Sequence, residues 1–321
     1  MKTLHTHSQQ RSRPVVGLVS LAICLVVLPA ATCDSHRPDA SAVERVFGQT
    51  GLGPGEFSYP RALAVSPNDG CVFVVDKTAR VQRFSAAGAY EHQWRMPEYA
   101  SGKPVGLFVD GDDRVWVPDT HYARVIVYDR DGRERFRFGE RGTGPGQFIF
   151  PTSVAIDRDG NIYVGEYGEN DRISKFSPQR RYLFSFADAA SGKGAVIRPT
   201  QIVIDETGIL WVADSCHHRI CRYDSDGRFL SAFGLPGTGE NRLNYPFGLA
   251  LERSGTILVA DQGNNRIVRY DRSGAVRGSW GSPGRAVGQL LHPWDIALAR
   301  DGSIYVLDSW NNRVQVLNWA S

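Results

Sequence analysis

The chain has 321 residues, of which 42% are hydrophobic and 22% charged, with 34 glycines and 17 prolines. This composition excludes an intrinsically disordered chain, a collagen and a coiled coil. The formal net charge is +3, but the three excess cations, Lys2, Arg11 and Arg13, lie within the first 33 residues. The remainder is electrically neutral, so the charge gives no support for a nucleic-acid-binding protein.

The first segment of the chain is expected to be a targeting signal. Residues 15–28 form an apolar run that is short for a membrane span, and small residues follow it up to Cys33. This stretch resembles a bacterial lipoprotein signal, which implies cleavage before Cys33 and lipidation of its thiol. Ordinary cleavage near Ala30 or Ala31, or an uncleaved anchor that reaches Ala31, are the alternatives. Each of the three places the folded part outside the cytoplasm, in the periplasm or at the cell surface.

A repeat of about 47 residues organises the chain after a short polar tether at residues 34–42. Six prolines each precede an apolar strand pattern, and their spacings are 44, 47, 48, 47 and 47 residues. The prolines are Pro60, Pro104, Pro151, Pro199, Pro246 and Pro293. After each proline, an apolar segment, a polar turn and a second apolar segment predict a β-hairpin.

Each second strand is predicted to end in an acid, and an arginine opens the third strand after a loop. The acids are Asp76, Asp119, Glu166, Asp214, Asp261 and Asp308, and the arginines are Arg80, Arg124, Arg172, Arg219, Arg266 and Arg313. Because this feature recurs in all six copies, we expect capping of the loops and ion pairing rather than a metal or substrate site. A fourth strand ends in an aromatic residue and a glycine, as at Phe138-Gly139.

The segments ADQGNNRIVRYD and LDSWNNRVQVLN, with GTGPGQFIFP before a strand, closely resemble the NHL repeat. The resemblance covers roughly residues 43–320 and implies an all-β fold, a six-bladed β-propeller of four-stranded antiparallel blades. Packing leads to the same fold, because stacking sheets around an axis hides both faces of each sheet. The sixth copy stops after its third strand, and residues 43–48 match a fourth strand. We therefore expect an amino-terminal strand to complete the last blade, with the propeller spanning residues 43–321.

The long connections, the acid-to-arginine loops and the residues after the prolines are expected on one face, at the mouth of a central channel. Positions that differ between the copies are the candidates for ligand binding there. These candidates are Arg61, Thr152, Tyr167, Thr200, Phe247, Trp294, Asp295 and Trp310. The alternative is that Phe247 and Trp294 only fill the channel.

Two thiols and two imidazoles, Cys216, His217, His218 and Cys221, lie within six residues. A disulfide between Cys216 and Cys221 is the first expectation for an exported protein, and unpaired thiols or a zinc site are the alternatives. Cys71 is expected to be a buried free thiol.

The favoured function is a non-catalytic, monomeric scaffold, with no cofactor, that binds a protein, a peptide or a glycan. It would bind no nucleic acid and would touch a membrane only through its amino-terminal lipid or anchor. The alternative is a metal-dependent lyase, or a lactonase- or esterase-like hydrolase, with calcium or zinc at the channel mouth. The NHL-type peptidyl-hydroxyglycine lyase holds zinc through histidines directly after the repeat prolines, and here no histidine occupies such a position. Asp295 alone supplies too few oxygen ligands for calcium.

Overall fold

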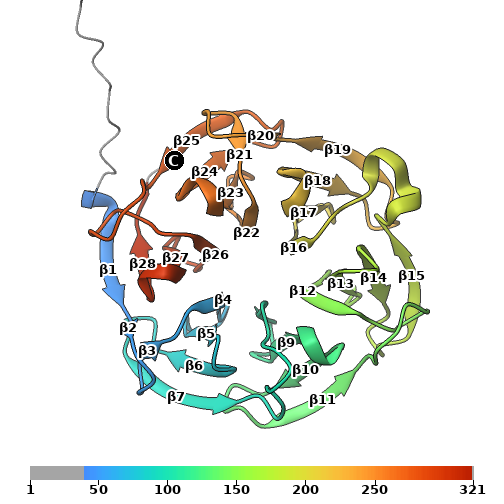
Figure 1. The fold of residues 1–321 in the computed structure, drawn as a ribbon, viewed down its shortest axis with the longest axis horizontal. Coiled ribbons are helices and arrows are strands. Elements are labelled where there is room, and N and C mark those ends of the chain that lie inside the picture. The colour runs from blue at the N-terminus through green and yellow to red at the C-terminus, as the bar shows by residue number, and fades with distance from the viewer. Residues whose placement is uncertain (1–39, 320–321) are drawn as a thin grey trace, which may run out of the picture. The chain divides into compact units, whose positions relative to one another are not determined.

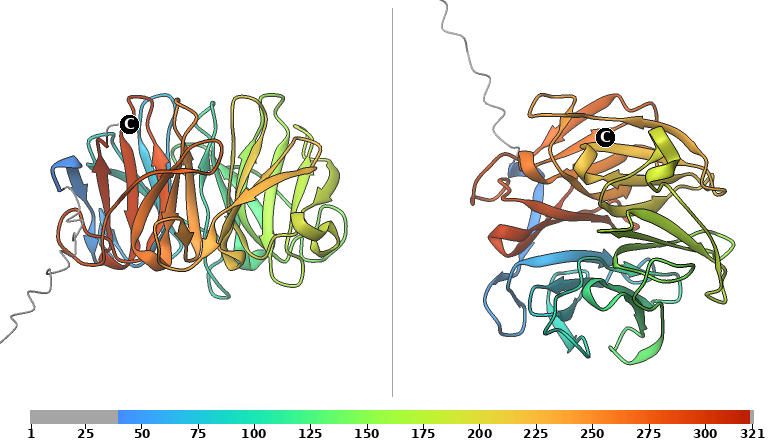
Figure 2. Two further views of the ribbon diagram at one scale, coloured as in Figure 1. Left: turned by 90° about the horizontal axis from the view of Figure 1, so that it is seen from above. Right: turned by 45° about the vertical axis from the view of Figure 1, so that its right-hand side comes forward.

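The computed structural model describes residues 40–319 and shows six four-stranded antiparallel sheets arranged as blades around a central axis (Figure 1). The predicted all-β, six-bladed propeller is confirmed. The strands run between two faces of the ring, which carry different sets of loops (Figure 2). In residues 40–319, no helix has the length and apolar character needed to cross a membrane. The predicted signal segment, with Cys33, lies outside the described residues.

The first three blades follow one another in chain order. Blade 1 contains β4 (Pro60–Val65), β5 (Val72–Asp76), β6 (Arg80–Phe84) and β7 (Tyr90–Arg95). Blade 2 contains β8 (Phe108–Val109), β9 (Val115–Asp119), β10 (Arg124–Tyr128) and β11 (Glu134–Phe138). Blade 3 contains β12 (Phe150–Ile156), β13 (Ile162–Tyr167), β14 (Arg172–Phe176) and β15 (Tyr182–Phe186).

The next two blades repeat this order, and the last takes its outer strand from the start of the chain. Blade 4 contains β16 (Pro199–Ile204), β17 (Leu210–Asp214), β18 (Arg219–Tyr223) and β19 (Phe229–Phe233). Blade 5 contains β22 (Pro246–Leu251), β23 (Ile257–Asp261), β24 (Arg266–Tyr270) and β25 (Val276–Trp280). Blade 6 contains β26 (Pro293–Leu298), β27 (Ile304–Asp308), β28 (Arg313–Leu317) and β1 (Val43–Phe47).

Short elements complete the chain between the blades. Two long connections each form a parallel two-stranded pair, β2 (Gln49–Thr50) with β3 (Glu56–Phe57) and β20 (Leu235–Pro236) with β21 (Arg242–Leu243). The 3-10 turns outside the acid-to-arginine loops are η1 (Ala40–Ala42) and η3 (Ala189–Gly194). Those within these loops are η2 (Thr120–Tyr122), η4 (Ser215–His217), η5 (Gln262–Asn264) and η6 (Ser309–Asn311).

The hydrophobic core is divided into six clusters, one at each seam between neighbouring blades. Strand β5 shows why. Phe73 and Val75 pack toward blade 2, while Val72 and Val74 pack toward blade 6. Successive side chains of a strand point to opposite faces, so burying both faces requires an almost continuous apolar run.

The ring is closed by the amino-terminal strand, as predicted. Strand β1 pairs antiparallel with β28, so that Val43 lies opposite Leu317 and Phe47 opposite Val314. The Asn318 backbone N–H also donates to the Ala42 carbonyl oxygen at 2.9 Å. The outer edge of the last blade is therefore covered by backbone hydrogen bonds to the start of the chain.

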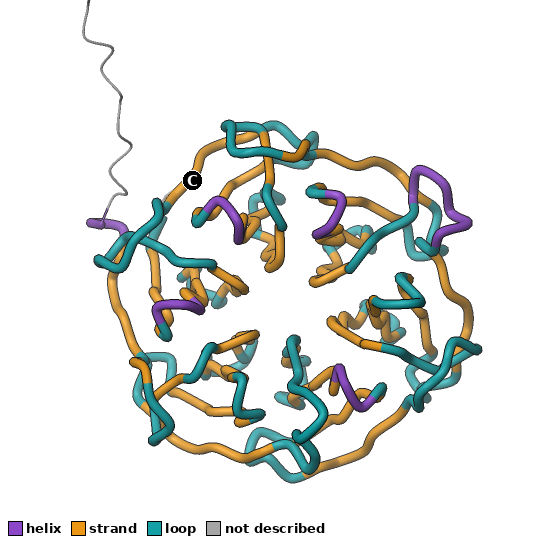
Figure 3. Tube along the Cα trace, viewed as in Figure 1, coloured by secondary structure: helices purple, strands orange, loops and turns teal. Residues whose placement is uncertain are grey.

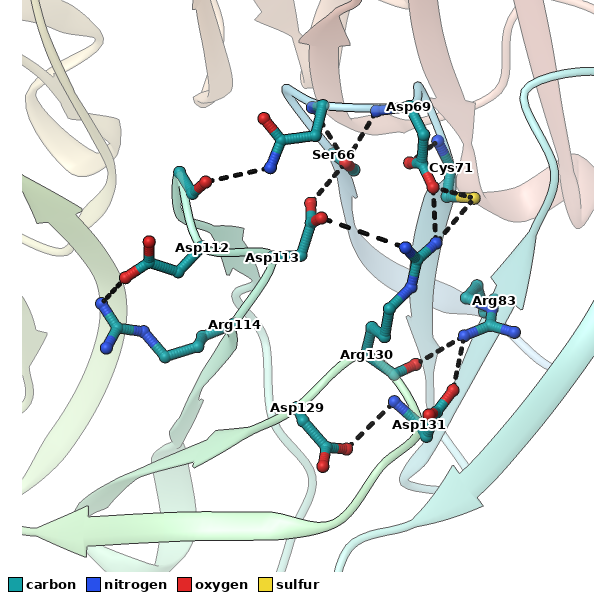
Figure 4. A network of polar contacts seen from close by, with 12 residues as sticks. Ser66, Asp69, Cys71, Arg83, Asp112, Asp113, Arg114, Asp129, Arg130 and Asp131 are labelled. Carbon is teal, nitrogen blue, oxygen red and sulfur yellow. Dashed lines mark hydrogen bonds and ion pairs between the residues drawn. The ribbon is translucent and has the colours of Figure 1, made fainter.

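The seam between blades 1 and 2 carries a polar network on the face formed by the tight turns (Figure 4). The Ser66 hydroxyl donates to Asp113 at 2.6 Å, and Arg130 pairs with Asp69 at 2.5 Å. Both contacts cross from blade 1 to blade 2. The Cys71 thiol lies 3.3 Å from Asp69, and it is buried and free, as predicted. Burial and the Asp69 carboxylate raise its pKa to about 11, so this thiol stays protonated near neutral pH.

Closure by β1 predicts unequal effects of substitutions at two adjacent residues. The Phe47 ring packs 5.0 Å from the Phe84 ring of blade 1, whereas Val46 is 38% exposed. Phe47→Ala should lower the free energy of unfolding by about 2 kcal/mol, because it removes a partly buried ring from the closing seam. Val46→Ala is the control and should cost about 0.5 kcal/mol or less. Urea denaturation measures both, and equal losses would contradict this role of β1.

Candidate functional site

Six acid–arginine pairs ring one face of the propeller, here called the loop face because it carries the long connections between blades. Figure 3 shows these connections and the 3-10 turns around the channel. The N···O distances are 2.7 Å for Asp76–Arg80, 2.8 Å for Asp119–Arg124, 2.6 Å for Glu166–Arg172, 2.7 Å for Asp214–Arg219, 2.9 Å for Asp261–Arg266 and 2.7 Å for Asp308–Arg313. The predicted ion pairing is confirmed in every blade.

These pairs also hold the connection that leads into their own blade. In blade 6, Arg313 donates to the carbonyl oxygens of Ala286 at 2.7 Å and Gln289 at 2.9 Å. The Leu291 N–H donates to Asp308 at 2.7 Å. Because Leu291 lies two residues before Pro293, the pair fixes where the innermost strand begins at the channel.

Asp119 is the exception among the six acids. Its Oδ1 atom is buried without a hydrogen-bond partner, whereas the acids of the other five blades each accept a backbone N–H from the entering connection. The connection into blade 2 is the shortest and places no N–H there. Burial therefore raises the pKa of Asp119 to about 6, although the hydrogen bond from Arg124 lowers it.

Four pairs of neighbouring blades are each joined on the loop face by a hydrogen bond that the repeat pattern did not predict. The residue before the arginine in one blade accepts the N–H of the residue before the proline in the next. The bonds are Tyr59 N to Asn312 Oδ1 at 2.7 Å, Arg198 N to Asp171 Oδ1 at 2.7 Å, Tyr245 N to His218 Nδ1 at 3.1 Å and His292 N to Asn265 Oδ1 at 2.7 Å.

All four donor residues have left-handed backbone angles, with φ between 48° and 59°. This conformation is costly for residues other than glycine, so the acceptor side chain maintains it. The two remaining blades have Ala79 and Ala123 at the acceptor position, and Lys103 and Phe150, which precede the next prolines, are not left-handed. The residue before the arginine in one blade thus determines the backbone conformation just before the innermost strand of the next blade.

The channel mouth brings together seven of the eight predicted ligand-binding candidates. One pocket is lined by Arg61, Val105, Thr152, Tyr167, Arg198, Thr200, Gln201, Phe247, Trp294 and Asp295. Its cavity volume is about 20 Å³, which is room for about one water molecule. The side chains therefore nearly fill the channel mouth, in agreement with the alternative that Phe247 and Trp294 close it.

Arginine and aromatic side chains stack on one another in this pocket. The Phe247 and Trp294 rings meet edge to face, with centroids 4.9 Å apart. The Arg61 guanidinium lies 4.2 Å from the Trp294 ring centroid. Arg198 lies 5.2 Å from the Tyr167 ring and 5.5 Å from the Phe247 ring. These distances permit cation–π attraction.

The polar candidates Thr152, Thr200 and Asp295 make contacts between blades. The Thr152 hydroxyl lies 2.6 Å from the Pro199 carbonyl oxygen, and the Thr200 hydroxyl lies 3.0 Å from the Phe247 carbonyl oxygen. Asp295 accepts the N–H groups of Leu63 at 3.0 Å and Ile296 at 2.8 Å. Burial raises the pKa of Asp295 to about 7. These groups join the innermost strands to one another.

Trp310, the eighth candidate, does not line this pocket. It belongs to η6, is 49% exposed, and its ring packs 4.1 Å from the His292 ring. Conversely, Arg198 and Gln201 line the pocket but were not predicted. Arg198 precedes Pro199, whereas the predicted candidates follow the prolines or lie in the acid-to-arginine loops. The residues before the six prolines also differ between the copies, and a comparison of these positions would have identified Arg198.

The predicted disulfide between Cys216 and Cys221 is absent, because both thiols are free. Cys216 lies in η4, whereas Cys221 lies in β18 with its thiol 3.7 Å from an Asp214 oxygen. His217 also contacts Asp214, at 2.8 Å, and the His218 ring accepts the Tyr245 N–H. In the part of the chain that the structure describes, no three His, Cys, Asp or Glu side chains gather as a metal site would require.

The raised pKa of Asp119 predicts a pH-dependent contribution to stability. An unfolded chain ionises this carboxyl near pH 3.8, whereas the folded protein does so near pH 6. The folded state therefore binds more protons in this window, and stability from this group falls as pH rises from about 4 to about 6.

Asp119→Asn should remove this contribution. As the pH rises from 4.5 to 7.5, the urea midpoint of the wild type should fall relative to the midpoint of Asp119→Asn. Asp112→Asn, in an exposed turn of the same blade, is the control and should track the wild type. A constant difference between wild type and Asp119→Asn would contradict the assignment.

Comparisons with known proteins agree with this architecture. The NHL repeat family matches residues 197–223 and 290–317, and a family described as 6-bladed beta-propeller matches residues 103–173. Protein brain tumor of Drosophila melanogaster is 28% identical over 102 residues, which are 32% of this chain and 9% of that protein. The chain thus matches only a small part of that curated relative.

Solved structures with the same fold have low sequence identity to this chain. Virginiamycin B lyase from Staphylococcus aureus superposes with a TM-score of 0.59 at 13% identity, covering 86% of this chain and 99% of the lyase. A protein of unknown function from Bacteroides thetaiotaomicron superposes with a TM-score of 0.66 at 16% identity, covering 86% of this chain and 73% of that one. Similarity at this level shows the fold alone. With the blade geometry and these matches, the chain is a six-bladed β-propeller in which residues 197–223 and 290–317 match the NHL repeat.

Proposed function

We propose that this protein is an exported, non-catalytic recognition scaffold that binds a protein or a peptide on its loop face. The observation that carries the proposal is an open groove beside blades 3 and 4, with a volume of about 1,050 Å³. A volume of this size accommodates several side chains of a bound peptide.

The groove has aliphatic and charged walls. The connection that contains η3 forms one wall, and Ala232 and residues 234–236 contribute another. Ile197 is 44% exposed and Leu235 is 59% exposed. Lys193 and His217 add polar groups to the lining. Aliphatic side chains next to polar ones suit a peptide better than a glycan, because sugars are bound mainly by stacking on aromatic rings and by hydrogen bonds.

Exposed large apolar side chains are concentrated on the loop face. Those in its connections and loops are Leu52, Tyr59, Tyr99, Ile197, Leu235, Tyr245, Val287 and Trp310. The three others lie on outermost strands and are Val46, Leu183 and Leu230. Such a concentration on one side of a protein is typical of an interaction surface.

The channel mouth supports the enzyme alternative less well. A cation there would face the guanidinium groups of Arg61 and Arg198, which repel it. Asp295, the carboxylate that lines the pocket, already accepts two backbone N–H groups. A metal-dependent lyase or hydrolase needs several free ligands at such a point.

The groove predicts which substitutions weaken binding. Peptides selected from a random library on the immobilised wild type should bind Ile197→Ser and Leu235→Ser variants at least about tenfold more weakly, because the apolar contacts are lost. Leu183→Ser and Leu230→Ser, on outer strands, are the controls and should bind as the wild type does. Isothermal titration calorimetry of the selected peptides measures the affinities.

Two results would contradict the proposal. Selected peptides that bind the groove variants and the wild type equally would place recognition elsewhere. Stoichiometric calcium or zinc in protein purified without a chelator would favour the enzyme alternative.

Export is the second part of the proposal and is supported by the apolar run at residues 15–28 followed by Cys33. The mature protein purified from its native membrane fraction should begin at Cys33 and carry lipid there, as intact-mass spectrometry would show. Cleavage near Ala30 or Ala31 without lipid would support ordinary secretion instead. Recovery of the full-length chain from the cytosol would contradict export.

A further inference from the structure

Two arginines at the channel mouth have no anionic partner among residues 40–319. Arg61 belongs to β4 of blade 1, and Arg198 directly precedes β16 of blade 4, so they reach the pocket from opposite sides of the ring (Figure 1). Neither side chain makes an ion pair or a hydrogen bond with the residues at 40–319. By contrast, the six arginines that begin third strands are all paired with acids.

The two positive charges oppose each other. Burial lowers the pKa of Arg61, and the charge of Arg198 lowers it further. Both side chains are only partly exposed, so water screens this repulsion incompletely. The nearby Asp295 side chain forms no ion pair with either arginine, and its oxygens accept the N–H groups of Leu63 and Ile296 instead.

The aromatic rings hold the guanidinium groups but leave their N–H groups without acceptors. Trp294 lies beneath Arg61, and Tyr167 and Phe247 flank Arg198. A ring face attracts the cation without accepting its N–H groups as an oxygen would. A guanidinium held in this way, with N–H groups still free, is suited to donate charge-assisted hydrogen bonds to an oxyanion.

The shape of the pocket selects among oxyanions. A cavity of about 20 Å³ admits roughly one oxygen-sized atom. A planar carboxylate can place one oxygen there with its remaining atoms in one plane outside, whereas the three remaining substituents of a tetrahedral phosphate need more room.

We propose that Arg61 and Arg198 form a receptor for a carboxylate at the mouth of the propeller channel. The ligand is an acidic peptide that inserts one carboxylate between the two guanidinium groups. That carboxylate comes from either its C-terminus or an acidic side chain. This site is separate from the groove beside blades 3 and 4, so either proposal can fail alone.

Three synthetic probes test the proposal in titrations of the whole propeller at constant ionic strength. The first is an acetylated tripeptide of glycine and alanine with a free C-terminal carboxylate, and the second is the same tripeptide amidated. The third is an amidated tripeptide with one aspartate side chain. We expect the first or the third to raise the melting temperature, which identifies the source of the carboxylate, and the second to leave it unchanged.

Substitutions separate binding from a structural role. Arg61→Gln and Arg198→Gln should each weaken binding of the active probe by at least about tenfold, the usual loss for a hydrogen bond to a charged group. Without probe, neither variant should melt below the wild type, because one of two repelling charges is removed. Arg180→Gln is the matched control, since Arg180 lies 4.3 Å from the Phe136 ring, is exposed and is outside the channel.

Several outcomes would overturn the proposal. The wild type would respond to none of the carboxylate probes, or equally to the amidated control. Both channel variants would retain full binding of the active probe. Alternatively, inorganic phosphate would raise the melting temperature more than any carboxylate, which would contradict the selection by shape.

Discussion

The structure depends on the fact that each four-stranded sheet is apolar on both faces. Strand β5 shows this most clearly, since its alternate residues enter two different hydrophobic clusters, one on each side of blade 1. A blade therefore needs a neighbour on both sides, and a row of blades satisfies this condition only when it closes into a ring. The pairing of β1 with β28 supplies that closure. Without it, the outer edge of the last blade would be left open.

The same repetition builds the loop face. Each acid–arginine pair holds the connection that enters its own blade, and four hydrogen bonds to residues before the prolines hold the entry into the next blade. The entries into blades 2 and 3 depart from this scheme, because Ala79 and Ala123 lack an acceptor side chain. The connection into blade 2 is also short. Asp119 is left with an unpaired oxygen as a result. The polar network between Asp69 and Arg130 joins blades 1 and 2 on the opposite face.

The repeat also distinguishes residues with a structural role, which recur in every copy, from candidate ligand-binding residues, which differ between copies. The features present in all six copies have structural partners, as the paired arginines show. At the channel mouth the copies differ, and there the structure distinguishes two groups. Thr152 and Thr200 bond to the backbone of the next blade. Arg61 and Arg198 stack on aromatic rings and pair with no acid among residues 40–319, so they are charged groups of this pocket that remain able to bind a ligand.

The sequence by itself determined the number of blades, the strand order and the closing strand, because all three follow from a periodic pattern of apolar residues, turns and prolines. It also grouped Arg61, Phe247 and Trp294 at the channel, since equivalent positions of a repeat lie at equivalent places in a ring. The tertiary structure alone decided that Trp310 lies apart, that Cys216 and Cys221 are unbridged and that Arg198 reaches the pocket. These depend on side-chain directions and on the left-handed backbone at Arg198, which a hydrogen bond from a different blade maintains. Contacts of that kind join residues far apart in the chain, and no local pattern encodes them.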